Sequence, residues 1–334
     1  MPIPDQAAVT RYAAEFEAAT GWRADGVPYC FGDSPELANE LVGLVLTGRK
    51  RATGCTLVEF QHEGEQVPQP GTHSVVYGGD GRPVCVLRTD EVCVGPLDEV
   101  LDPAFAWDEG EGNRTRDDWL EGHRAYWERN LPAIGAAYSL TMPVVLERFS
   151  VAWPVLAAPE PLATRDGLVV RPAWIDDRPW LAELVEERWH GTVALSGELI
   201  RPATMPALIA TDETGRRLGA LTFLPRQRPD GVHTELVTID AVDPGSGAGG
   251  VLLDALVALA RQESWRRVWL VTTNDNSRAL RSYQRAGWDL VALRRDAMDD
   301  VRRIKPGVPA HGLDGIPLRH QLELEYPLHL PGHD

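Results

Sequence analysis

Apolar side chains recur at helical spacing in two stretches near the start of the chain. Residues 5–20 predict one amphipathic helix, and residues 34–48 predict a second. The second stretch has clear end signals, because Ser34 is a favoured N-cap residue and Gly48 suits the position that closes a helix. We therefore expect the chain to open with two helices.

The pattern then changes to the two-residue alternation of half-buried β-strands. Three such runs are separated by Gly/Pro turns, with the sequences ATGCTLVEF, HSVVYG and RPVCVLRTDEVCV. A tryptophan-rich helical stretch over residues 115–131 and a strand over residues 142–153 follow. These elements predict a small β-sheet or barrel with flanking helices.

Residues 153–167 interrupt the pattern with prolines, small side chains and no apolar periodicity, which is typical of a linker. A chain of 334 residues is long enough for two domains, since one domain takes roughly 100–200 residues. We expect an N-terminal domain over residues 1–152, a linker over 153–167 and a C-terminal domain over 168–330.

The second half predicts a mixed sheet with helices on both faces. A strand-like run, GLVVRPA, and a helical run, IDDRPWLAELVEERW, come first, and we then expect PALIATD, RRLGALTFLP and VHTELVTIDAV to pair antiparallel. A glycine-rich loop leads into a helix over residues 250–263, and strand and helix then alternate. Together the two halves predict an α+β / α/β protein.

Charge limits the partners that the chain can bind. The sequence carries 33 basic and 49 acidic residues, a net charge of −16, and residues 1–155 hold 12 of the basic and 24 of the acidic ones. Proteins that follow long nucleic acids need a basic face, because neutralising phosphates supplies most of their affinity. GRKR at 48–51 is the one local basic candidate, so a single nucleotide near Arg49, Lys50 and Arg51 stays compatible with the charge.

Cysteine usage and hydropathy point to the cytoplasm. Cys30, Cys55, Cys85 and Cys93 make no C-x-x-C pair, so we expect buried or half-buried thiols and no metal site. The chain has no apolar run of about 18 residues, the length that a membrane-spanning helix needs. The first 21 residues have neither the basic nor the apolar region of a signal peptide.

The stretch DPGSGAGG contains G-x-G-x-x-G at Gly245, Gly247 and Gly250 and allows three interpretations. It could bind a dinucleotide, but that fold places the motif after its first buried strand, with a carboxylate about 20 residues further on. Here the motif follows three strands, and Asp275 is the available acidic partner. It could also be only a tight turn, although four glycines in six residues exceed what one turn needs.

The third interpretation is an anion site, because backbone amides at a helix N-terminus favour negative charge. The loop, the strand ending TTNDN and the spacing of Asn276, Ala279, Tyr283 and Gly287 together resemble the GNAT N-acetyltransferases over about residues 168–328. That resemblance implies acetyl-CoA as cosubstrate, its pyrophosphate on the loop and its pantetheine between two splayed strands. The implied cofactor-binding residues are Ala241, Val242, Gly245, Ser246, Gly247, Ala248, Gly249, Gly250, Asn276 and Ala279.

The resemblance also implies a catalytic role for Tyr283, whereas the family shares no single catalytic base. Tyr283 would protonate the leaving thiolate of CoA, and Glu235 on the strand before the loop is our candidate base for the acceptor amine. The alternatives are a core aromatic for Tyr283, a solvent-facing charge for Glu235 and a plain helix cap for Asn276. The sequence departs from the family at Pro244, where a basic or amide side chain usually precedes the glycines, so backbone must carry more of the phosphate binding.

The first half resembles the ASCH domain, a PUA-like β-barrel, over about residues 27–150. The matching stretches are FGDSPELANELVGLVLTGRKRATG and DEGEGNRTRDDWLEGH. The resemblance implies a cleft for a nucleobase, nucleoside or RNA segment. One branch of the family deacetylates N4-acetylcytidine, and its roles fall on Lys50, Thr53 and Glu109, with Glu111 as a rival. Lys50 on a solvated turn and Thr53 ending a strand, or a cleft that binds without hydrolysis, are the alternatives.

Other parts of the sequence border these sites. Trp119 and His123 share one helix face and could line the first cleft, although core packing is the commoner role for a tryptophan. Residues 190–197 are expected to border the acceptor pocket. Our leading hypothesis is a cytoplasmic N-acetyltransferase with an unknown amine acceptor, fused to an ASCH domain. The alternative is a non-catalytic regulator that binds CoA and an RNA or nucleotide.

Overall fold

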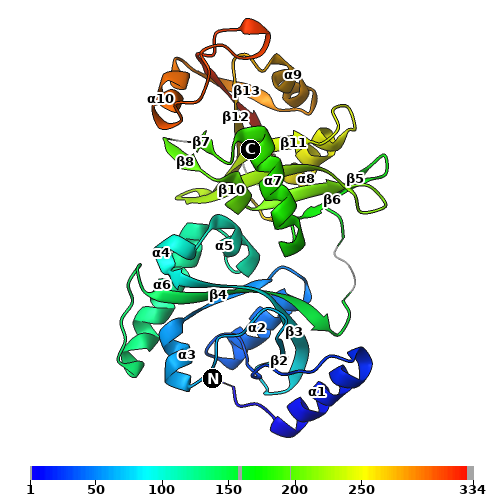
Figure 1. Ribbon diagram of the computed structural model, residues 1–334, viewed down its shortest axis with the longest axis vertical. Coiled ribbons are helices and arrows are strands. Elements are labelled where there is room, and N and C mark those ends of the chain that lie inside the picture. Colours follow the sequence, from blue (N-terminus) through cyan, green and yellow to red (C-terminus); the bar gives the residue numbers. More distant parts are fainter. Residues whose placement is uncertain (1, 157–159, 196, 329–334) are drawn as a thin grey trace. The chain divides into compact units, whose positions relative to one another are not determined.

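The computed structural model describes residues 2–156, 160–195 and 197–328. It divides the chain into two compact units, Met1–Pro159 and Glu160–Asp334, which are called the first and second unit below (Figure 1). Each unit has its own sheet and its own hydrophobic clusters. The domain boundaries at 152 and 168 stay predictions.

The first unit consists of helices around one sheet. Its helices are α1 (Gln6–Thr20), α2 (Pro35–Leu46), α3 (Leu57–Glu63), α4 (Leu97–Val100), α5 (Pro103–Glu109), α6 (Arg116–Asn130) and the 3-10 helix η1 (Leu131–Ile134). Its strands are β1 (Ala52–Thr56), β2 (His73–Tyr77), β3 (Pro83–Pro96) and β4 (Pro143–Trp153).

These four strands form an antiparallel sheet in the order β1-β4-β3-β2. Within the described residues the sheet stays open, so it is a curled half-barrel rather than a closed barrel (Figure 1). Val75 and Val86 pack against α1, whereas Cys85 and Leu87 pack against α2. Neighbouring residues of β3 point to opposite faces, so the two predicted helices cover the two sides of the sheet.

The predicted strand ATGCTLVEF is only half right, because it ends at Thr56 and helix α3 begins at Leu57. Thr56 and Glu59 form a capping box, in which each side chain accepts a hydrogen bond from the other residue's backbone amide. This T-x-x-E spacing is a helix-start signal in the sequence itself. The apolar residues that follow Thr56 favour a strand, so this helix-start signal was not recognised from the sequence.

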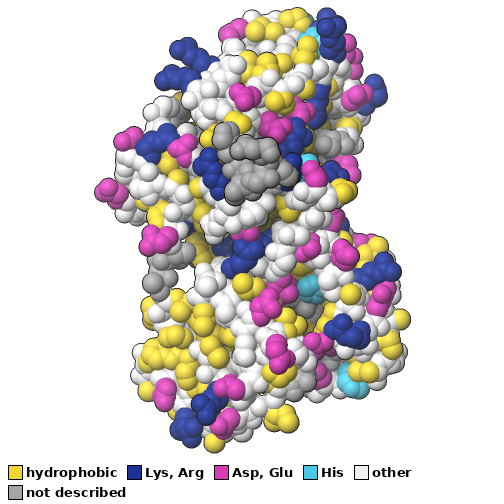
Figure 2. Space-filling model, turned by 180° about the vertical axis from the view of Figure 1, so that it is seen from behind, with side chains coloured by type: hydrophobic (Ala, Val, Ile, Leu, Met, Phe, Trp, Pro, Cys, Tyr) yellow, Lys and Arg dark blue, Asp and Glu magenta, His cyan; other side chains and the backbone are white. Residues whose placement is uncertain are grey.

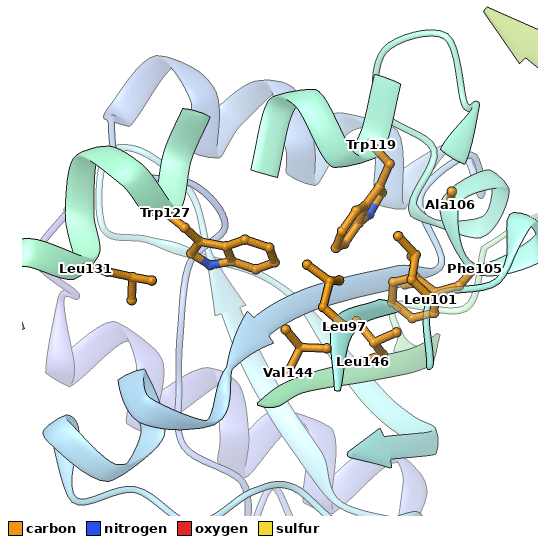
Figure 3. Close-up of a cluster of buried hydrophobic side chains, with 10 residues drawn as sticks. Leu97, Leu101, Phe105, Ala106, Trp119, Trp127, Leu131, Val144 and Leu146 are labelled. Atoms are coloured by element: carbon orange, nitrogen blue, oxygen red, sulfur yellow. The ribbon is translucent and has the colours of Figure 1, made fainter. Parts of the chain in front are cut away.

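Trp119 lies in a large apolar cluster of the first unit. Figure 3 shows its ring beside Leu97 and Phe105, with Trp127 further along α6. These side chains cover the part of the sheet formed by Ala52, Val144 and Leu146, which are at most 2% exposed. Core packing is therefore the main role of Trp119.

The second unit is built on a larger sheet. Its helices are α7 (Arg178–Trp189), α8 (Ala248–Gln262), α9 (Ser277–Arg285) and α10 (Ala297–Ile304), with 3-10 turns η2 (Ile175–Asp177), η3 (Pro202–Thr204) and η4 (Leu313–Gly315). Its strands are β5 (Ala163–Arg165), β6 (Leu168–Pro172), β7 (Val193–Leu195), β8 (Glu198–Ile200), β9 (Ala207–Thr211), β10 (Arg217–Arg228), β11 (Gly231–Ala241), β12 (Arg267–Thr273), β13 (Asp289–Arg294) and β14 (Gln321–Tyr326).

Eight of these strands form a mixed sheet in the order β13-β14-β12-β11-β10-β9-β6-β5. The predicted antiparallel pairing of β9, β10 and β11 is confirmed. β11 and β12 pair in parallel, and every other neighbouring pair is antiparallel. The hairpin β7–β8 and helix α10 lie in segments that the sequence pattern left unassigned.

Two adjacent residues of β10 show that helices cover both faces of this sheet. A Cβ on Gly219 would lie 3.3 Å from Ala248 and Leu252 of α8. Ala220, on the opposite face, packs in a cluster with Leu181 and Leu184 of α7. The prediction of a mixed sheet between helices is confirmed.

Strand β5 lies inside the segment predicted to be a linker. Residues 163–165 pair with 168–170 and extend the sheet beyond β6. Residues 157–159, which also belong to the predicted linker, lie outside the described residues. Three residues are too few to show a periodic pattern, so the sequence could not separate this edge strand from a linker.

The surface fits the acidic composition. On the face drawn in Figure 2, the Lys and Arg side chains are scattered among Asp and Glu and form no continuous basic stripe. Among the described residues, no helix has the length and apolar character needed to cross a membrane.

Candidate functional site

Strands β11 and β12 pair over four residues and then part. His233–Leu236 face Arg267–Leu270, and the pairing ends there. On its other side β11 shifts register against Thr222 and Phe223, which leaves Val237 as the extra residue of a β-bulge. Beyond the bulge, the edge of β11 that faces β12 has no strand partner in the described chain, so its backbone groups are open to a ligand.

The glycine loop joins this end of β11 to α8. Gly245 and Gly247 have positive φ angles of 89° and 85°, which only glycine adopts without strain. Helix α8 begins at Ala248, and its N-cap Gly247 offers no capping side chain. Within the described chain, the backbone amides of Gly247, Gly249 and Gly250 have no hydrogen-bond acceptor. They form a cluster of donors at the positive end of a helix.

Glu235 lies just before the point where the two strands part. Its side chain is 4% exposed and is flanked in the sheet by Leu224 on β10 and Trp269 on β12. Among the described residues, its carboxylate makes no hydrogen bond or ion pair. Burial raises the pKa of Glu235 to about 7, although Arg294 and Arg226 oppose the shift.

Tyr283 lies on α9 with its ring 6.4 Å from that of Trp288. It is 8% exposed, and burial raises the pKa of its phenol, with Asp240 adding to the shift. Asp240 near the end of β11 accepts a hydrogen bond from the indole of Trp189 at 2.7 Å. Burial raises the pKa of Asp240, and this bond lowers it in part.

The polar turn after β12 is held by its own contacts. Asn276 caps α9 by accepting a hydrogen bond from the amide of Ala279 at 3.1 Å. Asp275 is 5% exposed and accepts a hydrogen bond from the amide of Leu313 at 2.8 Å. Asp275 therefore holds a loop and is not free to bind a ribose, which removes the acidic partner of the dinucleotide interpretation.

The first unit contains a second buried cluster of charges around Lys50, which is 1% exposed. Its ammonium nitrogen lies 2.5 Å from a carboxylate oxygen of Glu111 and 3.4 Å from one of Glu109. The same nitrogen lies 5.3 Å from the ring centre of Phe31. The alternative that Lys50 sits on a solvated turn is wrong.

Glu109 is the centre of this cluster, and it is 2% exposed. Its carboxylate also contacts the indole nitrogen of Trp119 and lies 3.3 Å from His123. The rings of Trp119 and His123 stack with centres 3.7 Å apart. Burial by itself would raise the pKa of Glu109, but Lys50 and His123 outweigh burial and lower it to about 2.

The basic stretch at 48–51 is used inside the protein. Arg49 donates a hydrogen bond to the carbonyl of Gly110 at 2.9 Å, and Arg51 lies 2.6 Å from Asp108. All three cations therefore contact the segment 108–112. This stretch is not a free basic patch for nucleic acid.

Two family models match the chain, one over each unit. The first is described as an ASCH domain and matches residues 27–152, and the second is described as the acetyltransferase (GNAT) family and matches residues 169–288. The chain joins an ASCH domain to a GNAT acetyltransferase domain. Neither the loop after β11 nor the cluster around Lys50 would identify these families alone, because each is a short local pattern.

Similar proteins cover one half of the chain each. The uncharacterized Bacillus subtilis protein YdhI is 29% identical over 144 residues, which make up 42% of this chain and 87% of that protein. An ASCH domain structure from Lactobacillus crispatus is 29% identical, with a TM-score of 0.38, and covers 44% of this chain and 92% of its own. A GNAT family acetyltransferase from Elizabethkingia anophelis, solved with acetyl-CoA bound, is 18% identical, with a TM-score of 0.36. The match covers 49% of this chain and 100% of that structure's chain.

In the GNAT domain the predicted residues lie along β11, in the glycine loop that follows it, and at the cap and on the face of α9. Glu235 precedes the separation of β11 and β12, and Ala241 and Val242 lead from β11 into the glycine loop. Asp240 was missed, because one acidic residue in an alternating strand gives no sequence signal. Of the predicted border of the acceptor pocket, residue 196 lies outside the described residues, and 193–195 form β7.

In the ASCH domain the structure brings Lys50, Glu109 and Glu111 together. Thr53 is half-buried in β1 opposite Glu147 of β4, and no hydrogen bond joins its hydroxyl to Lys50 in the described chain. Its role stays a prediction. The four cysteines are free thiols, and Cys93 is exposed, contrary to the expectation of burial. The described residues contain no group of three His, Cys, Asp or Glu side chains that could hold a metal ion.

Proposed function

We propose that the second unit is an acetyl-CoA-dependent N-acetyltransferase that acts on an amine. The observation that carries this proposal is Glu235, a buried carboxylate without a partner in the described chain, placed where β11 and β12 part. Leaving a buried carboxyl group unpaired costs stability, so its retention there favours a chemical role. Perturbed groups of this kind mark functional sites.

Glu235 suits the task of a general base. A base is most effective when its pKa lies near the working pH, and burial raises the pKa of Glu235 to about 7. The amine would attack the thioester carbonyl of acetyl-CoA directly, while Glu235 takes the proton from the nitrogen, either directly or through a water molecule. The carbon–sulfur bond then breaks, and the acetyl group remains on the amine.

The free amides of Gly247, Gly249 and Gly250 support a phosphate site for acetyl-CoA at the start of α8. The free edge of β11 after Val237 supports binding of the pantetheine amides by strand-like hydrogen bonds. Donors along that edge would polarise the acetyl carbonyl as negative charge develops on its oxygen.

Tyr283 would give a proton to the departing thiolate. Burial raises the pKa of its phenol, which keeps it protonated. A Tyr283→Phe variant should bind CoA normally and lose about 10²-fold or more in turnover. Turnover equal to that of the native chain would remove this role for Tyr283 and leave the transferase proposal intact.

Calorimetry on the full chain with CoA and acetyl-CoA, followed by transfer assays on a panel of amines, tests the transferase. Binding together with acetylated product supports it. CoA binding without transfer to any amine supports the alternative of a non-catalytic regulator. No CoA binding at millimolar ligand would contradict both, because both need the glycine loop to hold phosphate.

For the first unit we propose a nucleobase-sized ligand beside Lys50, Glu109 and His123. These three polar side chains converge at a buried point next to the stacked rings of Trp119 and His123. Two carboxylates contact the Lys50 nitrogen, and no hydrogen bond in the described chain joins that nitrogen to the hydroxyl of Thr53. Ligand binding, to a nucleoside or to an RNA segment, is thus better supported than hydrolysis.

Incubation of the full chain with N4-acetylcytidine separates binding from hydrolysis. Release of cytidine and acetate, lost in a Lys50→Met variant, would establish the amidohydrolase. Binding of the nucleoside without release would establish a recognition site. A ligand that binds the Lys50→Met variant equally well would place the site elsewhere.

A further inference from the structure

Arg165 lies against the first turn of α8, although it comes from the segment that the sequence predicted to be a linker. Strand β5 carries it to the edge of the sheet beside this helix. If Gly250 had a Cβ, that atom would lie 3.0 Å from Nη1 of Arg165. The guanidinium also forms an ion pair with Asp254, one helical turn further on, and both side chains are nearly half exposed.

The glycine loop itself has no cation to offer a phosphate. Residues 241–250 contain one charged side chain, and it is the acidic Asp243. A diphosphate at this place would meet free amides and the positive end of a helix, but also this carboxylate. Charge-assisted hydrogen bonds to phosphate are about twice as strong as neutral ones, so a nearby guanidinium would decide much of the affinity.

The glycines of the loop indicate that the space at the first turn is needed. Gly245 and Gly247 are explained by their positive φ angles, and Gly250 by the guanidinium of Arg165, which would contact a Cβ there at 3.0 Å. Gly249 has no positive φ and nothing within 4 Å of its Cβ position. No contact in the described chain explains Gly249, although glycine weakens a helix. A ligand at the helix start explains it.

We propose that Arg165 is the side chain that binds the diphosphate of CoA, in the role that Pro244 leaves vacant in the loop. The proposal rests on the proposed transferase function. In the free protein Asp254 holds the guanidinium beside the helix start. When CoA binds, some of the N–H groups of Arg165 donate hydrogen bonds to the diphosphate oxygens instead of to Asp254. The backbone amides of Gly249 and Gly250 donate to other oxygens of the same diphosphate.

The test compares the affinities of full-length variants for CoA and for 3′-dephospho-CoA by calorimetry. Arg165→Gln should lower the affinity for both ligands by the same factor, about tenfold or more, because both ligands contain the diphosphate. The matched control is Arg228→Gln, an exposed arginine nine residues along β10 from Gly219, hence about 30 Å away. It should leave both affinities unchanged.

A second variant separates ligand binding from a merely structural ion pair. Asp254→Asn breaks the same pair but keeps the cation, so it should leave CoA affinity equal or higher. If Asp254→Asn and Arg165→Gln lower the affinity for CoA by the same factor, the ion pair between Arg165 and Asp254 only holds β5 against α8. The proposal is then wrong. A loss confined to CoA with its 3′-phosphate would also overturn it.

The transferase proposal can fail separately. It fails if the native chain does not bind CoA at all. The Arg165 proposal fails if the native chain binds CoA and Arg165→Gln binds it equally well.

Discussion

Burial changes the acid–base chemistry of Glu235 by raising the pKa of its carboxyl group. In an exposed position its carboxylate would be fully ionised at neutral pH and a weak base. Enclosed between Leu224 and Trp269, it has a pKa raised to about 7 by burial. Its proton affinity is thereby matched to an amine that must lose a proton in the reaction.

This leads to a pH prediction for Glu235→Gln. In the native chain, turnover should fall as pH drops through about 7, because the base becomes protonated. The variant should lose about 10²-fold or more in turnover and the acidic limb of the profile with it. A pH–rate profile of both proteins is the measurement. An acidic limb that persists in the variant would assign the base to another group, with Asp240 as the next candidate.

The raised pKa of Glu235 affects folding stability in the opposite direction: turnover rises with pH, whereas stability falls. A raised pKa means that the folded protein favours the protonated carboxyl, so this contribution is present below the unfolded pKa of about 4.3 and is lost as pH rises through about 7. Glu235→Gln removes the cost of ionisation. Its melting temperature relative to the native chain should therefore rise as pH increases from about 4.3 to about 7 and stay constant at higher pH.

Glu109 is shifted in the other direction, and its replacement should weaken the first unit. Its carboxylate stabilises the fold above the unfolded pKa of about 4.3, and this contribution is lost as pH falls towards about 2. Glu109→Gln removes one of the two carboxylates that contact the buried Lys50, while Glu111 stays in contact, and should cost about 1–3 kcal/mol. Denaturant unfolding at pH 7 measures this.

Glu128→Gln is the matched control for that experiment. Glu128 also pairs with a cation, Arg124, but both side chains are at least half exposed. An exposed pair contributes little, so the unfolding midpoint should not change measurably. Equal effects at Glu109 and Glu128 would contradict the assignment of Glu109 as a buried electrostatic centre.

At the scale of elements, the start of α8 combines a weak helix end with a binding surface. Gly249→Ala should stabilise the helix by about 0.5–1 kcal/mol, because alanine has the higher helix propensity and no neighbour obstructs its Cβ. The substitution should also lower the affinity for CoA, because the methyl group enters the space beside the free amides. Thermal unfolding and calorimetry on one preparation measure both effects.

Gly122→Ala provides the control in another helix. Gly122 lies within α6 with nothing within 4 Å of its Cβ position. The substitution should stabilise the chain by a similar amount and leave CoA affinity unchanged. If Gly249→Ala behaves in the same way, the diphosphate does not approach the first turn of α8.

Elements also show where sequence patterns succeed and fail. The amphipathic helices α1 and α2 and the antiparallel β9–β11 follow from periodicity and caps, because those signals act over a few neighbouring residues. Strand β5 is too short for such a signal and exists because it pairs with β6. Helix α3 carries a cap signal that an apolar run conceals.

At the scale of the whole molecule, each unit has cores of its own. We expect the full chain to unfold in two thermal transitions, since cooperative unfolding belongs to a single core. CoA should raise only the transition of the second unit, by mass action on the state that binds it. Differential scanning calorimetry with and without CoA is the measurement. One transition that CoA shifts as a whole would mean that the units unfold together.

The sequence by itself determined many local features of this protein: the amphipathic helices α1 and α2, the antiparallel strands β9–β11, the glycine loop before α8 and the residue types at both candidate sites. These depend on periodicity, caps and turn residues, which act between near neighbours in the chain. Only the tertiary structure decided that Lys50 is buried between Glu109 and Glu111, that Glu235 has no partner in the described chain, and that Arg165 reaches the start of α8. Those outcomes depend on contacts between segments about 10 to 85 residues apart, because burial and charge pairing are properties of the packed chain.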